Sequence, residues 1–156
     1  MRVAIIGQGY VGLTIATDAA ASGHHVVGFD VNPALVTQLN SGVSHIEGIS
    51  NTELAGYLNK GTYRASTDAS VLDACEVIVI AVPTPLDENR NPDLSFVHAA
   101  ADLIAKNVKS PALIVNESTL IKPIISPSIS ASAHVKFPKM IPFLPITTGT
   151  PKQISF

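Results

Sequence analysis

Residues 1–30, MRVAIIGQGYVGLTIATDAAASGHHVVGFD, predict the type of fold. Their first apolar run, Arg2–Ile6, is rich in β-branched residues and is typical of a buried strand. Apolar and small residues then recur at helical spacing over Tyr10–Ser22, and His25–Phe29 forms a second apolar run. A strand, a helix and a second strand in this order predict a βαβ unit with parallel strands.

The same alternation continues through the next ninety residues. Further strands are expected at 62–66, 76–82 and 112–115, and helices at 34–40, 52–60, 68–73 and 94–107, with Asp68 and Asp93 as caps of the last two. Alternating strands and helices favour an α/β fold whose sheet is covered by helices on both faces. The predicted fold class is therefore a doubly wound, mostly parallel, Rossmann-type sheet of five strands in a single domain, followed by an irregular C-terminal extension.

A glycine-rich loop, Gly7 to Gly12, joins the first strand to the first helix. In this context Gly7 permits a tight turn, Gly9 lets a pyrophosphate approach the backbone, and Gly12 allows close packing of the helix on the strand. The unpaired N–H groups at the start of the helix would face the phosphates. The pattern predicts a dinucleotide site, and the alternative is a plain strand-to-helix turn whose glycines serve packing alone.

Asp30 ends the second strand, 18 residues after Gly12. A carboxylate there can accept hydrogen bonds from the hydroxyls of an adenosine ribose, and it would repel a 2′-phosphate. The predicted cofactor is therefore NAD rather than NADP. If the loop is only a packing turn, Asp30 is a solvated loop acid.

Composition excludes several other classes of protein. The chain has 156 residues, about one domain, with 46% hydrophobic and 14% charged residues and a net charge of −2, so it has no general basic surface for nucleic acid. Its single cysteine cannot form an intramolecular disulfide, and no apolar stretch reaches the ~18 residues that cross a bilayer. We therefore expect a cytoplasmic protein with no membrane segment.

Charge is divided unevenly along the chain. Residues 1–117 hold all 12 acids and carry a net charge of −6, whereas residues 118–156 hold four lysines, no acid and six of the 11 prolines. We interpret residues 1–119 as one domain and 120–156 as an atypical proline- and serine-rich tail. A natural ending, a truncated chain and a frameshift or gene decay would each produce such a tail, and the loss of acids favours the last.

Two further segments follow predicted strands at the carboxyl edge of the sheet, where doubly wound folds bind ligands. The first contains Pro83 and Thr84, and the second is 116–119, Asn-Glu-Ser-Thr. Rigid prolines can hold Thr84 against a cofactor, but they also suit an ordinary strand exit. Glu117 is equally consistent with a site acid and with a surface carboxylate.

Taken together, these motifs resemble the N-terminal NAD-binding domain of the UDP-glucose/GDP-mannose dehydrogenases. The resemblance rests on the Gly-Tyr-Val-Gly loop, the Val-Pro-Thr-Pro turn and the Glu-Ser-Thr segment, in that order, and covers residues 1–119. Val-Pro-Thr-Pro-Leu-Asp, the later Pro-Asp-Leu-Ser and 44–47, Ser-His-Ile-Glu, look more like the UDP-N-acetylglucosamine and UDP-N-acetylmannosamine 6-dehydrogenase branch. The resemblance implies a cytoplasmic oxidoreductase of nucleotide-sugar metabolism and polysaccharide biosynthesis.

The family oxidises the C6 alcohol of a nucleotide sugar to a carboxylate in two NAD-dependent steps, through an adduct on a cysteine. By resemblance, Thr84 would lie near the nicotinamide half, and Thr119 would help to place cofactor and catalytic water. The implied cofactor-binding residues are Gly7, Gln8, Gly9, Tyr10, Val11, Gly12, Asp30, Pro83, Thr84 and Thr119.

The chain also departs from the family pattern. The family usually has a basic residue five positions after the acid, where this chain has Leu35, and the Pro-Gly-Thr turn that should follow Glu-Ser-Thr is replaced by 120–123, Leu-Ile-Lys-Pro. The nucleophilic cysteine is absent, because Cys75 has no basic partner or glycine loop beside it and is predicted to be a small core residue. The five histidines have no metal-ligand spacing, so no metal site is predicted.

These observations predict an NAD-binding module of a nucleotide-sugar 6-dehydrogenase, inactive as this chain alone. A UDP-sugar would be bound only if the missing domain were supplied, and a homo-oligomer or a partner chain is compatible with the sequence. The alternatives are a non-catalytic nucleotide-binding or regulatory module that pairs with another chain, and a nonfunctional remnant.

Overall fold

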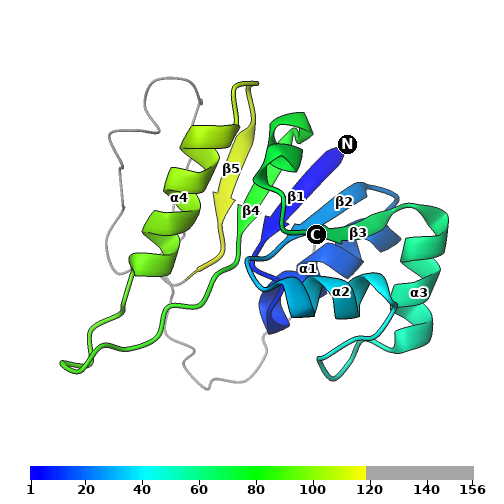
Figure 1. Ribbon diagram of the computed structural model, residues 1–156, viewed down its shortest axis with the longest axis horizontal. Coiled ribbons are helices and arrows are strands. Elements are labelled where there is room, and N and C mark those ends of the chain that lie inside the picture. Colours follow the sequence, from blue (N-terminus) through cyan, green and yellow to red (C-terminus); the bar gives the residue numbers. More distant parts are fainter. Residues whose placement is uncertain (119–156) are drawn as a thin grey trace, which may run out of the picture.

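Five short strands form one parallel sheet in the computed structural model, which describes residues 1–118 (Figure 1). The strand order is β3-β2-β1-β4-β5. The elements are β1 (Arg2–Ile6), α1 (Tyr10–Ala21), β2 (His25–Phe29), α2 (Pro33–Asn40), α3 (Asn51–Lys60), β3 (Tyr63–Ser66), the 3-10 helix η1 (Ala69–Ala74), β4 (Val77–Ile80), α4 (Ser95–Asn107) and β5 (Leu113–Asn116). The predicted doubly wound α/β sheet of five strands is confirmed.

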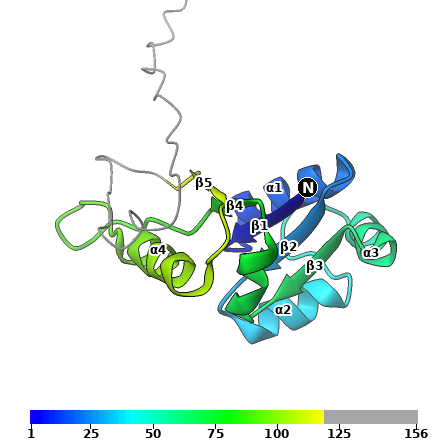
Figure 2. The same cartoon turned by 90° about the horizontal axis from the view of Figure 1, so that it is seen from above.

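The core has two layers because alternate side chains of each strand point to opposite faces of the sheet. α1, α2 and α3 pack on one face, around Ile5, Leu13, Leu39, Leu54 and Tyr63. η1 and α4 pack on the other face, around Ile6, Phe29, Leu72, Ile78 and Ile104. Figure 2 shows α1 and α4 on opposite sides of the sheet.

Local sequence explains where most of the helices begin and end. The side chain of Asn32 accepts hydrogen bonds from the first N–H groups of α2, and Pro33 takes the first helical position. Ser50 Oγ accepts from the N–H of Glu53 at the start of α3, and Gly61 ends that helix at φ 68°. The local sequence therefore explains where α2 and α3 begin and where α3 ends.

Two expected boundaries change. The predicted strand at 76–82 is paired only over Val77–Ile80. We expect Asp93 to cap α4 from the sequence, but the N-cap residue is Leu94. Asp93 Oδ1 instead accepts a hydrogen bond from the main-chain N–H of Ser95 at 2.9 Å. The predicted cap of η1 is confirmed, since Asp68 Oδ1 accepts from the N–H of Ser70.

The strand order reverses direction between β1 and β4, because β2 and β3 extend the sheet on one side of β1 and β4 and β5 on the other. In open parallel sheets the crevice at the carboxyl ends of such strands is the usual ligand site. The expected C-terminal extension and Thr119 lie outside the described residues. Among the described helices, none has the length and apolarity needed to cross a membrane.

Candidate cofactor site

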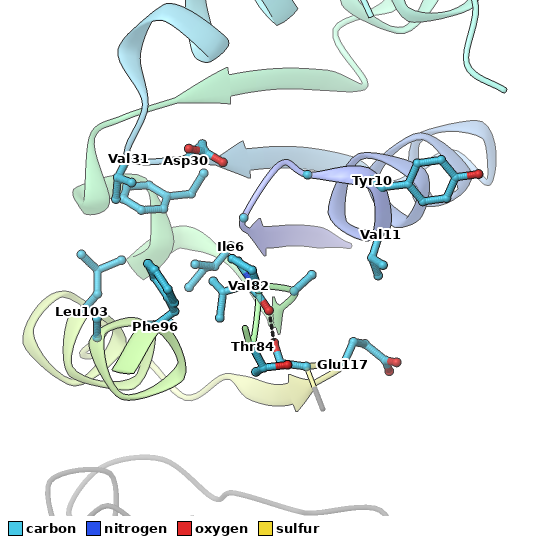
Figure 3. A pocket seen from close by; sticks show the side chains of 18 of the residues that line it. Ile6, Tyr10, Val11, Asp30, Val31, Val82, Thr84, Phe96, Leu103 and Glu117 are labelled. Atoms are coloured by element: carbon cyan, nitrogen blue, oxygen red, sulfur yellow. Dashed lines mark hydrogen bonds between the residues drawn. The ribbon is translucent and has the colours of Figure 1, made fainter. Parts of the chain in front are cut away.

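A pocket of about 680 Å³ opens at the carboxyl ends of β1, β2, β4 and β5 (Figure 3). Its walls come from the glycine loop, the end of β2, the segment after β4, one side of α4 and the end of β5. The lining residues include Gly7, Gly9, Tyr10, Val11, Asp30, Val31, Leu35, Pro83, Thr84, Phe96, Leu103, Glu117 and Ser118. The pocket therefore lies at the point where the strand order reverses.

Two glycines of the loop are required by the protein itself. Gly7 has φ +89°, and a Cβ there would approach the carbonyl oxygen of Ala81 to 2.7 Å. At Gly12 a Cβ would overlap the carbonyl oxygen of Gly7. Any side chain at either position would force the loop away from β1 and β4, so both glycines are explained by packing and backbone conformation.

Gly9 is different. It has φ −71°, which any residue can adopt, and a Cβ there would meet nothing within 4 Å. Nothing among the described residues therefore requires a glycine at this position. The free space lies where Gly9 lines the pocket, so the absence of a side chain leaves room for something other than the protein.

The first turn of α1 offers unpaired donors to this space. The first three N–H groups of an α-helix have no partner within the helix, and here they belong to Tyr10, Val11 and Gly12. Gly9, the N-cap residue, supplies no side-chain hydrogen bond, and no acid stands in the first turn. α2 and α3, in contrast, are capped by Asn32 and Ser50. The uncapped helix end favours an anion in the pocket.

Asp30 is held by two main-chain donors. Its Oδ2 accepts from the N–H of Gln8 at 2.8 Å, and its Oδ1 accepts from the N–H of Asn32 at 2.9 Å. Each carboxylate oxygen has a second acceptor position, so the half-buried group can still accept from hydroxyls in the pocket. The carboxylate thus combines a fixed orientation with free acceptor capacity.

The opposite walls of one part of the pocket are apolar. Val31, 81% exposed, follows β2, whereas Phe96, 46% exposed, and Leu103 project from α4 (Figure 3). Leu35, which also follows β2 in the sequence, lines the same pocket. Large apolar side chains that face each other across a gap can take a flat, mainly apolar ring between them. Among the described lining residues no lysine or arginine occurs, so no basic side chain among them would offset the charge of an anion.

The other part of the pocket is lined by Thr84, Glu117 and Ser118. Ser118 Oγ donates a hydrogen bond of 2.9 Å to the carbonyl oxygen of Val82 (Figure 3, dashed line). This bond ties the segment after β5 to the segment after β4, which carries Pro83 and Thr84. A hydroxyl, a carboxylate and main-chain groups are thus available beside the glycine loop.

The structure brings most of the predicted site residues together, but not all of them. Gly7, Gly9, Tyr10, Val11, Asp30, Pro83 and Thr84 line the pocket. Gly12 is not among the residues that line the pocket. The Gln8 side chain is fully buried and turned into the core. Val31, Phe96 and Leu103 line the pocket but were not predicted from the sequence, since single apolar residues resemble core residues. Phe96 could have been predicted, because it lies at the start of α4, at the carboxyl edge of the sheet.

Cys75 and the histidines of residues 1–118 are not among the residues that line this pocket. Cys75 is buried, 3% exposed, and burial raises the pKa of its thiol, so the predicted core role is confirmed. Within residues 1–118, no group of three His, Cys, Asp or Glu side chains is placed to hold a metal ion.

Comparison with known proteins agrees with the geometry. The profile of the UDP-glucose/GDP-mannose dehydrogenase family, NAD binding domain, matches residues 1–131. UDP-N-acetyl-D-mannosamine dehydrogenase of Pyrococcus horikoshii is 36% identical over 121 residues, 77% of this chain and 29% of that protein. UDP-N-acetyl-D-glucosamine 6-dehydrogenase of Pseudomonas aeruginosa is 32% identical over 120 residues, 77% of this chain and 28% of that protein. These relatives agree with the branch that the motifs indicate.

A solved structure shows the same fold. GDP-mannose dehydrogenase from Pseudomonas aeruginosa superposes with a TM-score of 0.72 at 32% identity, over 77% of this chain and 29% of that one. The chain thus spans less than a third of the length of these relatives. The glycine loop, the pocket and the family match together show that the chain belongs to the UDP-glucose/GDP-mannose dehydrogenase family, of which it is the NAD-binding domain.

Proposed function

We propose that NAD binds in the pocket with its pyrophosphate at the N-terminus of α1 and its adenosine ribose at Asp30. The observation that carries this proposal is Gly9: its Cβ position is open, its φ of −71° needs no glycine, and it lines the pocket. A pyrophosphate passing over Gly9 explains why a side chain is absent there. The unpaired N–H groups of Tyr10 and Val11 would then donate to the phosphate oxygens.

The apolar and polar parts of the pocket wall indicate where the two ends of the cofactor would lie. The adenine ring would lie between Val31 and Leu35 on one side and Phe96 and Leu103 on the other, because these apolar side chains line one part of the pocket. The nicotinamide half would then extend past Thr84. Thr119, which the resemblance assigns to the placement of cofactor and water, remains part of the proposal.

Charge in the pocket favours NAD over NADP. Asp30 would accept hydrogen bonds from the ribose diol, and its negative charge would repel a 2′-phosphate. Among the described lining residues no basic side chain offsets that repulsion. The preference therefore depends on one carboxylate whose orientation is set by its two main-chain donors.

For the whole protein we propose the NAD-dependent oxidation of a UDP-N-acetylhexosamine at C6. The support is the identity to dehydrogenases of UDP-N-acetylmannosamine and UDP-N-acetylglucosamine. NAD, when bound, accepts the hydride that leaves the C6 carbon. Residues 1–119 would bind and orient the cofactor, whereas sugar binding and the nucleophile belong to a part of such enzymes that this domain does not contain.

Calorimetric titration with NAD and NADP tests the cofactor site. We expect NAD to bind the wild-type chain, and Asp30→Asn to weaken NAD about tenfold, the effect of a hydrogen bond to a charged group. The same variant should narrow the preference for NAD over NADP. Asp18→Asn is the matched control, because it removes an equal charge from an exposed position of α1 that does not line the pocket.

No binding of NAD by the wild-type chain would refute the proposed cofactor site and favour a nonfunctional remnant. Equal losses in Asp30→Asn and Asp18→Asn would show that only net charge matters and that Asp30 does not contact the ribose. Turnover of a UDP-sugar by this chain alone would overturn the assignment of the chemistry to another part of the enzyme.

A further inference from the structure

Gln8 is the one residue of the glycine loop whose side chain points into the core. It is fully buried, although a glutamine in a loop would ordinarily face water. Its amide Nε2 donates to the carbonyl oxygens of Ile5 at 3.0 Å and Gly7 at 3.2 Å, and its Oε1 accepts from the hydroxyl of Tyr63 at 2.9 Å. The side chain therefore ties the loop to β1 and to β3, 55 residues further along the chain.

The space for this contact is made by a third residue. Gly28 of β2 lies between the two partners: a Cβ there would overlap the Gln8 amide and lie 2.8 Å from the Tyr63 hydroxyl. Tyr63 itself is only 2% exposed. An amide and a phenol buried in this way must be paired with each other, because neither reaches water.

An apolar pair could fill the same space without any such requirement. Buried polar pairs are costly when one partner is missing, but when complete they define one arrangement of the chain. Besides Tyr63, Gln8 and Thr17 are the buried polar residues of the described chain. Thr17 bonds only within its own helix, to Leu13 and Thr14, whereas Gln8 connects separate elements.

The position that Gln8 holds bears directly on the pocket. Its main-chain N–H donates to Asp30 Oδ2 at 2.8 Å, so one residue is fixed by its side chain to β3 and by its backbone to the acid at the end of β2. The preceding residue, Gly7, has φ +89° and no side chain, and it would otherwise allow the peptide to turn. Fixing the Gln8 peptide therefore fixes one oxygen of Asp30.

We propose that Gln8 and Tyr63 are positioning residues for cofactor selectivity: their buried hydrogen bond holds the Gln8 peptide against Asp30, and so orients this carboxylate for a ribose diol rather than a 2′-phosphate. Neither side chain touches the cofactor. The inference rests on the proposed NAD site, because it assigns a cause to the orientation of Asp30. The competing explanation is that the pair only stabilises the fold.

A double-mutant cycle separates the two explanations. Gln8→Met keeps the length of the side chain without its amide, Tyr63→Phe removes only the hydroxyl, and the double variant removes both polar groups. Tyr63→Phe leaves the Gln8 amide oxygen without its partner, and Gln8→Met leaves the Tyr63 hydroxyl and two carbonyl oxygens without the amide, so each should lower the urea midpoint. The double variant should recover the part of that loss that belongs to the Gln8–Tyr63 bond. The double variant thus lacks the hydrogen bond without leaving the amide oxygen or the hydroxyl unpaired.

Two measurements are made on the double variant. The first needs no ligand: we expect hydrogen exchange of the residue-8 amide to rise tenfold or more, while core amides of β1 and β4 exchange at the wild-type rate. The second is the ratio of the dissociation constants for NADP and NAD, which we expect to fall at least threefold. Thr17→Val is the matched control, because it removes a buried hydrogen bond away from the site and should leave the ratio unchanged.

The outcomes are distinct. Wild-type exchange at residue 8 in the double variant, or a wild-type NADP to NAD ratio, would overturn the positioning role and leave the pair as a structural contact. A ratio that falls equally in Thr17→Val would overturn it as well. Absence of NAD binding by the wild-type chain would instead refute the proposed function on which the inference rests.

Discussion

The main-chain N–H of Gln8 and the Oδ2 of Asp30 are joined by a hydrogen bond of 2.8 Å across 22 residues of sequence. The bond connects the loop after β1 with the end of β2, the two segments to which the pyrophosphate and the ribose are assigned. Because one hydrogen bond joins the two segments, a change in either segment should alter the position of the other.

The glycines of the loop should separate binding from folding. Gly9→Ala should change the free energy of unfolding by no more than about 1 kcal/mol, since its φ suits alanine and its Cβ position is open, while NAD affinity falls tenfold or more. Gly12→Ala should destabilise the fold by about 1–3 kcal/mol or more, because its Cβ overlaps Gly7. Urea unfolding and calorimetry measure both. An unchanged NAD affinity in Gly9→Ala would remove the main support for the site.

A basic residue at position 35 should strengthen binding. Leu35 lines the pocket, and no lysine or arginine is found among the described lining residues. Leu35→Arg should raise NAD affinity up to about fivefold, the usual size of an exposed charge interaction, and the gain should shrink in high salt. Leu35→Gln is the uncharged control. A gain that does not depend on salt would argue against a charge interaction between the residue at position 35 and the cofactor.

The Ser118 hydroxyl should matter for both stability and binding. Its bond to the carbonyl of Val82 holds the segment that carries Thr84. Ser118→Ala should lower stability by about 0.5–1.5 kcal/mol and weaken NAD a few fold, if the segment after β4 positions the cofactor. Ser22→Ala, which removes an exposed hydroxyl bond at the end of α1, should affect stability less and NAD affinity not at all.

Tyr63 should make the fold sensitive to alkaline pH. Burial, and then the charge of Asp30, raise the pKa of its hydroxyl well above the ordinary value of 10.0. The unfolded chain therefore loses this proton near pH 10 while the folded chain keeps it, so stability is complete below pH 10 and falls as pH rises above it. Tyr63→Phe should lose less stability between pH 9 and 11. Parallel curves for the two proteins in urea unfolding would contradict this explanation.

Much of the fold can be read from the sequence because its signals are local. The apolar runs of β1 and β2, the glycine after α3 and the cap of η1 each depend on neighbours within a few residues, and all appear where they are expected. Asp93 shows the limit of such reading. An acid just before a helix can act either as the N-cap residue or as a hydrogen-bond acceptor in the preceding turn. Here the backbone conformation makes Leu94 the N-cap residue.

The candidate site shows the same division. Gly7, Gly9, Gly12 and Asp30 could be identified from their spacing, because the strand–loop–helix geometry fixes what each position must do. Leu103 could not, since an apolar residue on an amphipathic helix is the same letter whether it faces the core or a pocket.

A parallel α/β sheet, a glycine loop and an acid at the end of the second strand could be predicted from the sequence alone, because they follow from periodicity and short-range spacing. That the Gln8 side chain turns inward to Tyr63, and not outward to a ligand, is visible only in the folded chain. That choice depends on the space left by Gly28, and on the pairing of β2 with β3 that brings Tyr63 beside it. Contacts across 55 residues leave no periodic trace in a single sequence, so the residue that holds the loop was found only in the folded chain.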